Sequence, residues 1–197
     1  LASALELLGL PDTFLDELAQ HATPQPAPVG SPLAARVQEL ERIAFVDALT
    51  GISSRRAWLH DVQARITGGA TGSVLVCDVD YLKQVNDTHG HAAGDIVLVE
   101  TARVLARRGL AGRLGGDEFA LWIDGDAVDA ELIALEIVAD LSVSLKETVA
   151  ASEEASVSIG IAETPRHGTE IGALVAVADA ALYEAKSAGR RRARVAA

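Results

Sequence analysis

The chain has 197 residues, of which 49% are hydrophobic and 23% are charged, and its formal net charge at pH 7 is −11. This length and apolar content suit one globular domain with a well-formed core, and they exclude an intrinsically disordered chain. The negative charge argues against binding to a nucleic acid polymer, which needs a basic face. It does not exclude a mononucleotide, which needs only a few cations and a metal ion.

No apolar run approaches the length of a membrane span and no signal peptide is evident, so we expect a cytoplasmic protein. The single cysteine, Cys77, lies inside an apolar run and is expected to be a small buried residue, which leaves no intramolecular disulfide. Because the chain begins with Leu1 and contains no methionine, we expect it to be part of a longer protein.

The first 46 residues are expected to precede the main domain, which spans residues 47–197. Residues 1–22 carry a weak helical pattern, and the four prolines of residues 23–32 predict an extended linker. Apolar residues then recur at helical spacing over residues 33–46. That helix is either the end of a coiled-coil stalk or a helix packed on its own domain, because two heptads do not decide between them.

Beyond residue 47, strand and helix patterns alternate. Strands are predicted at 73–77, 119–123 and 156–161, the last of them half-buried, and helices at 95–108, 128–146 and 169–187. This alternation favours a sheet covered by helices, either α/β or α+β. The two tryptophans, Trp58 and Trp122, are expected in the core.

The segment Arg113-Leu-Gly-Gly-Asp-Glu-Phe119 places two glycines directly before two carboxylates, with an apolar strand behind them. It predicts a hairpin tip that leads into a buried strand. A backbone without side chains lets a bulky anion approach, and paired carboxylates can hold the divalent metal that neutralises it. Taken alone, the motif favours a surface turn with ordinary solvated acids.

The second informative stretch runs from Asp78 to Asp95. Its Asp-x-Asp opening suggests an EF-hand, but Lys83 occupies the position that needs glycine and His89 that of the bidentate glutamate. A Walker A loop is also absent. For Asp78 alone, the default interpretation is an acid that caps a helix. Two separate carboxylate groups at strand ends, at 78 and at 117–118, favour a shared metal site instead.

Four motifs in order resemble those of the GGDEF domain family of diguanylate cyclases; they lie at residues 47–56, 78–95, 115–119 and 181–190. The resemblance implies an α+β fold related to nucleotide cyclases and the polymerase palm. That fold has a ferredoxin-like βαββαβ core and a mostly antiparallel sheet flanked by helices. It also implies the reaction, in which two GTP condense to cyclic di-GMP and two pyrophosphates.

The resemblance also implies a metal site. Asp78 and Asp117, with the carbonyl of Val79, would hold two Mg²⁺ or Mn²⁺ ions per GTP. Glu118 would take a metal or proton-transfer role, and Asp80 would either support the site or form structural hydrogen bonds.

In the same resemblance, Gly115 and Gly116 leave space for the sugar and α-phosphate, and Asn86 and Asp95 read guanine. A carboxylate that accepts from the guanine N–H groups discriminates against adenine, which lacks them. The remaining residues implied to bind GTP contact its phosphates: Lys83 with the backbone amides of Tyr81 and Leu82, and the pair Lys186 and Arg190. Lys186 and Arg190 are expected to be one helical turn apart and so to share a face, although on sequence alone they are an ordinary basic C-terminal turn that balances the helix dipole.

The family's R-x-x-D inhibitory motif is missing, because Ala106 and Gly109 stand at its two defining positions and the neighbouring Arg107 and Arg108 do not replace them. Product inhibition through that site is therefore expected to be weak or absent. Leu82 replaces the usual Phe and Ser54 the usual Asn, and His89 and His91 are expected to be structural.

The reaction that the resemblance implies requires a second GGDEF chain in a homodimer, since each chain would hold one GTP, and an upstream sensor domain is a possible further partner. A silent module that binds GTP or a cyclic dinucleotide, and a cyclase of altered base choice, are the alternatives.

Overall fold

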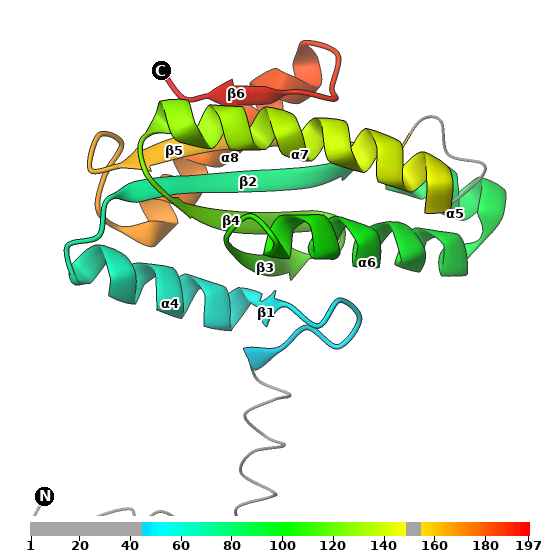
Figure 1. Ribbon diagram of the computed structural model, residues 1–197, viewed down its shortest axis with the longest axis horizontal. Helices are drawn as coiled ribbons and strands as arrows, with labels where there is room; N and C mark the ends of the chain where they lie inside the picture. The colour runs from blue at the N-terminus through cyan, green and yellow to red at the C-terminus, as the bar shows by residue number, and fades with distance from the viewer. Residues whose placement is uncertain (1–44, 149–154) are drawn as a thin grey trace, which may run out of the picture. The chain divides into compact units, whose positions relative to one another are not determined.

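The computed structural model describes residues 45–148 and 155–197 (Figure 1). Its strands form one six-stranded sheet in the order β1-β3-β4-β2-β5-β6. In chain order the strands are β1 (Ser53–Ser54), β2 (Gly72–Asp80), β3 (Leu110–Gly115), β4 (Glu118–Asp124), β5 (Ser156–Thr164) and β6 (Ala193–Val195). The helices are α4 (Arg55–Thr67), α5 (Leu82–His89), α6 (His91–Ala106), α7 (Ala127–Thr148) and α8 (Ile171–Ser187).

The order of the elements confirms the expected α+β fold. Strand β2 lies at the centre and pairs antiparallel with both β4 and β5, while β3 and β4 form an antiparallel hairpin. Together with the α5–α6 pair and α7, these four strands make the ferredoxin-like core. The short edge strands β1 and β6 pair in parallel with β3 and β5, so the sheet is mixed but mostly antiparallel.

Helices cover both faces of the sheet, and alternate residues of each central strand enter one of two apolar cores. Leu75, Cys77 and Val79 of β2 pack with residues of α6 and α7. Val74 and Val76 pack with α4 and α8 on the opposite face. Figure 1 shows α6 and α7 in front of the sheet and α8 behind it. Cys77 is fully buried and free, as expected.

Both tryptophans are core residues, and each satisfies its indole N–H within the fold. Trp58 is fully buried and donates to the carbonyl of Leu110 at 2.8 Å, while Trp122 donates to a carboxylate oxygen of Asp124 at 2.7 Å. Such a partner is what a buried indole requires.

Some boundaries differ from the prediction. Strand β2 continues to Asp80, so Asp78 lies within the strand and not at its end. Strand β5 is almost entirely buried and not half-buried, because α7 and α8 cover its two faces. Helix α6 begins at His91, four residues early, and α5 occupies a stretch in which no helix was predicted; only Leu82 and Val85 of α5 are buried, which leaves little apolar periodicity to detect.

The predictions for residues 1–44, namely the weak helix, the linker and most of the 33–46 helix, lie outside the described residues. Among the helices of the described ranges, none is both long and apolar enough to cross a membrane.

Candidate active site

The glycine-acid segment forms the tight turn between β3 and β4. Gly115 and Gly116 have φ angles of 149° and 52°, which residues with a Cβ rarely adopt, and no atom lies within 4 Å of where either Cβ would stand. The turn is therefore open to a ligand on the side of its missing side chains. Asp117 is half-buried at its tip, and the exposed Glu118 begins β4.

This turn lies directly beside the acidic end of β2. The Val79 N–H donates to the carbonyl of Asp117 at 3.1 Å, and Asp78 stands opposite Glu118 in the strand register. Residues predicted to share a site from segments 39 positions apart are thus neighbours in space.

Asp78 is 8% exposed and its carboxylate meets the amino group of Lys186, from the last turn of α8, at 2.8 Å. Burial raises the pKa of Asp78 to about 6, against the opposing effect of Lys186 and with further increase from the charges of Asp117 and Asp80. The site therefore concentrates negative charge that one lysine only partly offsets.

Asp80, two residues further on the same face of β2, has structural partners. Its carboxylate accepts from the hydroxyls of Ser156 at 2.7 Å and Ser158 at 2.9 Å, and from the backbone N–H of Arg191 at 3.3 Å. The guanidinium of Arg190 is 3.8 Å away. Of the two roles considered for Asp80, these contacts favour hydrogen bonding that ties β2 to β5 and to the segment after α8.

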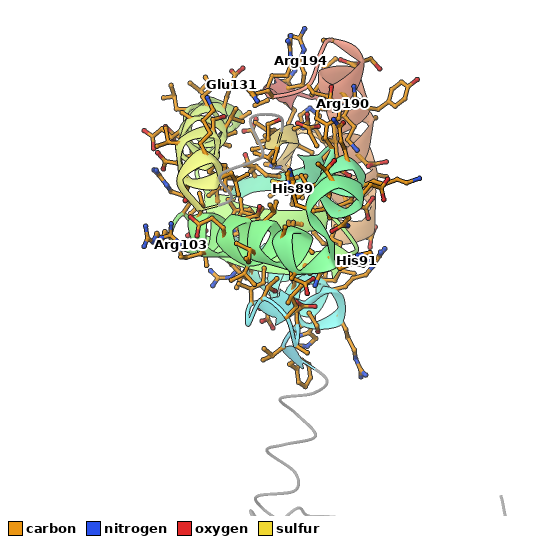
Figure 2. The ribbon with its side chains drawn as sticks, turned by 90° about the vertical axis from the view of Figure 1, so that its right-hand side faces the viewer. His89, His91, Arg103, Glu131, Arg190 and Arg194 are labelled. Atoms are coloured by element: carbon orange, nitrogen blue, oxygen red, sulfur yellow. The ribbon has the colours of Figure 1, made fainter. Side chains whose placement is uncertain are left out.

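Arg190 reaches the site by a different route from the one predicted. Helix α8 ends at Ser187, and Arg190 has a left-handed φ of 60°, so it does not sit one helical turn after Lys186. Its guanidinium instead lies over the ring of Tyr81, 5.1 Å from the ring centroid. Figure 2 shows Arg190 at the end of the molecule where α5 lies.

The predicted phosphate-binding segment forms the start of α5. Tyr81 is half-exposed with a left-handed φ of 60°, Leu82 is buried, and Lys83 is exposed in the first helical turn. The unpaired N–H groups of a helix N-terminus attract anions, so the backbone here suits a phosphate. Leu82, which replaces Phe, fills a position in the apolar core.

The first predicted base-reading residue, Asn86, packs against Gly94, which directly precedes the second, Asp95. A Cβ on Gly94 would lie 1.9 Å from the side-chain oxygen of Asn86. Because glycine has no Cβ, the Asn86 amide can lie against α6. Asp95 is the next residue of α6 and is exposed. Gly94 is therefore a site residue that the sequence reasoning missed, although it stands beside Asp95 in the second motif.

A divalent metal ion suits the donor set. The carboxylates of Asp78 and Asp117 and the carbonyl of Val79 are hard oxygen ligands of the kind that Mg²⁺ and Mn²⁺ prefer, and the surrounding charge is negative. In the described part of the chain no three His, Cys, Asp or Glu side chains converge as a metal cluster. A metal here would take its remaining ligands from water or from substrate. His89 and His91 are exposed.

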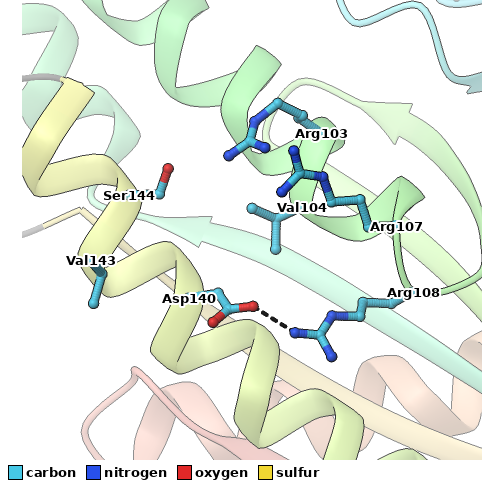
Figure 3. Close-up of a pocket in the computed structure, with 7 residues that line it drawn as sticks. All are labelled: Arg103, Val104, Arg107, Arg108, Asp140, Val143 and Ser144. Atoms are coloured by element: carbon cyan, nitrogen blue, oxygen red, sulfur yellow. Dashed lines mark hydrogen bonds and ion pairs between the residues drawn. The ribbon is translucent and has the colours of Figure 1, made fainter.

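The region of the missing inhibitory motif holds an arginine-lined cavity between α6 and α7, of about 610 Å³ (Figure 3). Arg108 is engaged there by two carboxylates of α7, those of Glu136 and of Asp140, the latter at 2.6 Å. Ala106 and Gly109 are exposed and bring no polar side chain to it.

Comparison with known proteins agrees with this geometry. Residues 44–192 match the family described as "Diguanylate cyclase, GGDEF domain". An uncharacterized 19.3 kDa protein of Streptomyces ambofaciens is 39% identical over 174 residues, which are 84% of this chain and 88% of that protein. The diguanylate cyclase TpbB of Pseudomonas aeruginosa is 40% identical over 177 residues, 82% of this chain but only 40% of TpbB.

Among solved structures, the coiled coil and GGDEF domain of DgcB from Caulobacter crescentus, in complex with c-di-GMP, superposes with a TM-score of 0.73 at 29% identity. That match covers 93% of this chain and all of the DgcB chain. The fold, the turn at Gly115–Glu118 (the signature turn) and the similar proteins all point to the same family. The chain belongs to the GGDEF family of diguanylate cyclases, which are nucleotidyltransferases.

Proposed function

We propose that this domain condenses two GTP molecules into cyclic di-GMP and releases two pyrophosphates, and that it does so as a pair of identical chains. The observation that carries the proposal is the meeting of the intact signature turn with the buried Asp78. The Val79–Asp117 backbone bond holds the two acidic segments together at one end of the sheet.

The site residues divide into groups by the part of GTP that they would contact. Asp78, Asp117 and the Val79 carbonyl would hold two Mg²⁺ or Mn²⁺ ions, which when bound lower the pKa of a hydroxyl and stabilise developing charge on the phosphates. Lys186 and Arg190, with Lys83 and the amides at the start of α5, would bind the β- and γ-phosphates.

Lys186 now pairs with Asp78 at 2.8 Å. On binding GTP its ammonium group would turn from that carboxylate to the phosphates, a small movement for a flexible side chain. The Asp95 carboxylate would accept from the guanine N–H groups, and the Asn86 amide would bind the same edge of the base. The open face of Gly115 and Gly116 would admit the ribose and α-phosphate.

Bond formation requires two sites that face each other. The 3′-oxygen of each GTP attacks the α-phosphorus of the other, the bond from that phosphorus to the β-phosphate bridging oxygen breaks, and pyrophosphate leaves. The proton of the 3′-hydroxyl passes to a nearby base, for which Glu118, exposed beside Asp117, is our candidate. Each step occurs twice, because each of the two GTP molecules attacks the other once.

We further propose that this activity is not limited by product binding between α6 and α7. Ala106 and Gly109 leave that region without the Arg and Asp of the family motif, and Arg108 is already paired with two acids. Addition of cyclic di-GMP at micromolar concentration is expected to leave the initial rate unchanged. Noncompetitive inhibition of the wild-type chain that is lost in Arg107→Ala or Arg108→Ala would contradict this.

The direct test incubates the full chain with GTP and Mg²⁺ or Mn²⁺ over a range of protein concentrations and resolves the products by chromatography. Cyclic di-GMP should form at a rate that rises more steeply than linearly with protein concentration. GTP binding without turnover at high protein concentration would favour the silent binding module, and products that contain adenine in the presence of ATP would favour altered base choice.

The matched variants are Asp117→Asn and Asp124→Asn. Asp117→Asn removes a metal ligand from a turn and should lower kcat by at least about 10²-fold with the same thermal midpoint. Asp124→Asn makes the same chemical change at the far end of β4 and should retain activity. Equal activity in the two variants would refute the role of Asp117.

A further inference from the structure

Arg113, which lies in β3 two residues before Gly115, joins two parts of the molecule that are distant in sequence. Its Nε and Nη2 atoms donate to the carbonyl oxygen of Gly116 at 3.1 and 2.7 Å. Its Nη1 atom donates to the carboxylate of Asp47, 3.1 Å from Oδ1 and 3.4 Å from Oδ2. One planar guanidinium therefore holds the signature turn with one edge and Asp47 with the other.

Asp47 itself is fixed within a closed turn at the start of the domain. Its Oδ1 accepts from the backbone N–H of Thr50 at 2.9 Å and from the Thr50 hydroxyl at 2.6 Å, and its own N–H donates to the carbonyl of Ile52 at 2.9 Å. Burial raises the pKa of Asp47, but the bonds from Thr50 and Arg113 together outweigh it and the net shift is downward. Asp47 is thus a charged, anchored acceptor at neutral pH.

The signature turn depends on such bonds for its position. No side chain packs on the open face of Gly115 or Gly116, and glycine has the largest conformational freedom of any residue. The strand register is also irregular here, with a shift between Arg113 and Gly115. Three hydrogen bonds from residues outside the turn hold it: one from the Val79 N–H to the Asp117 carbonyl, and two from the Arg113 guanidinium to the Gly116 carbonyl.

We propose that Arg113 is a positioning residue for the catalytic turn, and that Asp47 anchors it, so that the segment entering the domain controls the placement of Asp117. The inference rests on the proposed function and adds to it a physical connection between residues 45–52 and the reacting end of the sheet. A movement of the entering segment that displaces Asp47 would release Arg113 and loosen the turn without any contact with GTP.

The variant Arg113→Lys tests whether the geometry of the guanidinium matters in addition to its charge. Lys carries the same charge and can pair with Asp47, but its single ammonium group lacks the fork that bonds both the carboxylate and the Gly116 carbonyl at once. Arg113→Lys is therefore expected to keep the fold while lowering kcat by about tenfold or more, because small displacements of a catalytic group are costly. The KM for GTP should change by less than about threefold, since the proposed function assigns Arg113 no part of GTP to bind.

The anchor is tested by a double-mutant cycle in the full chain with Arg113→Gln and Asp47→Asn. Each variant alone should lower kcat, and the double variant should be no slower than Arg113→Gln, because the effect of Asp47 passes through Arg113. Arg103→Gln is the matched control: it removes an arginine that also pairs with a carboxylate, Glu100, but on α6 away from the turn. All variants are assayed over a range of GTP concentrations up to saturation, at several protein concentrations, and with their thermal midpoints measured.

Three results would overturn the inference: unchanged kcat in both Arg113 variants, a loss confined to KM, or losses that multiply independently in the double variant. A second readout does not need turnover. In ¹⁵N-labelled protein, Asp47→Asn should shift or broaden the amide signals of Gly115 and Gly116, which Asp47 does not contact. If wild-type protein makes no cyclic di-GMP yet these signals move, the proposed function fails and the coupling stands; if they do not move, the coupling fails.

Discussion

Asp78 and Asp80 lie two residues apart on one face of β2, yet their partners give them different roles. Asp80 accepts hydrogen bonds from Ser156, Ser158 and a backbone N–H, which leave little room for another ligand. Asp78 faces one mobile cation, Lys186, and carries a pKa raised to about 6 by burial. A carboxylate with a single exchangeable partner is the better metal ligand, so spacing along the strand does not by itself assign the role.

Gly94 gives the sharpest prediction at this scale. A Cβ at this position would lie 1.9 Å from the Asn86 oxygen and 2.9 Å from its Cγ, so Gly94→Ala must turn the Asn86 side chain away from its place against Gly94. The KM for GTP should rise about tenfold or more through the lost guanine contact. The free energy of unfolding should stay the same or increase by up to about 1 kcal/mol, because alanine has a higher helix propensity than glycine.

The control for Gly94 is Gly172→Ala, the same change near the start of α8, where the new Cβ meets only the flexible end of Glu170. It should leave the KM for GTP unchanged. Steady-state kinetics and thermal unfolding of both variants decide the matter. A normal KM in Gly94→Ala would show that Asn86 does not read the base.

Between elements, Glu100 joins α6 to α7. It is 9% exposed, accepts a two-bond contact from Arg103 on its own helix, and accepts from the hydroxyl of Ser144 on α7. The hydrogen bonds from Arg103, with that from Ser144, hold the pKa of Glu100 below its ordinary value of 4.5, although burial opposes them. The charged form of Glu100 is therefore favoured in the folded protein.

A carboxylate with a lowered folded-state pKa stabilises the fold above its unfolded pKa, and this contribution is lost as the pH falls through the folded pKa. Glu100→Gln should therefore reduce the free energy of unfolding at pH 7 by about 1 kcal/mol, given that Arg103 is partly solvated. The difference from wild type should shrink below about pH 4.5. Urea unfolding at pH 7 and pH 3.5 measures both values, and a constant difference would contradict the account.

The helices with a continuous apolar stripe, α7 and α8, and the apolar strand segments were predictable, because their periodicity is long. Helix α5 was not, since two buried residues make no stripe. The position of Arg190 was not predictable either, because Arg190 itself adopts a left-handed φ that turns the chain away from the direction of α8. Arg113 and Gly94 were missed for another reason: their importance lies in a bond across 66 residues and in an atom that is absent, and neither leaves a local pattern.

At the scale of the whole molecule, one chain carries only half of the proposed reaction. A single copy presents one signature turn, and condensation needs the α-phosphate of one site to meet the 3′-hydroxyl of another. Each chain has a formal net charge of −11, and bound GTP adds to it. Two copies therefore repel each other over long distances before their sites come together.

Moderate salt should relieve this repulsion, since the screening length falls from about 30 Å at 0.01 M to about 8 Å at 0.15 M. We expect the protein concentration that gives half-maximal activity per chain to decrease over this range at saturating GTP and metal. The KM for GTP serves as the control, because weakened phosphate contacts would raise it and act in the opposite direction. Sedimentation at the same salt concentrations should show a matching increase in dimer. If salt instead raised the half-maximal concentration while leaving KM unchanged, attraction between specific charged groups, and not net repulsion, would govern the pairing of the two chains.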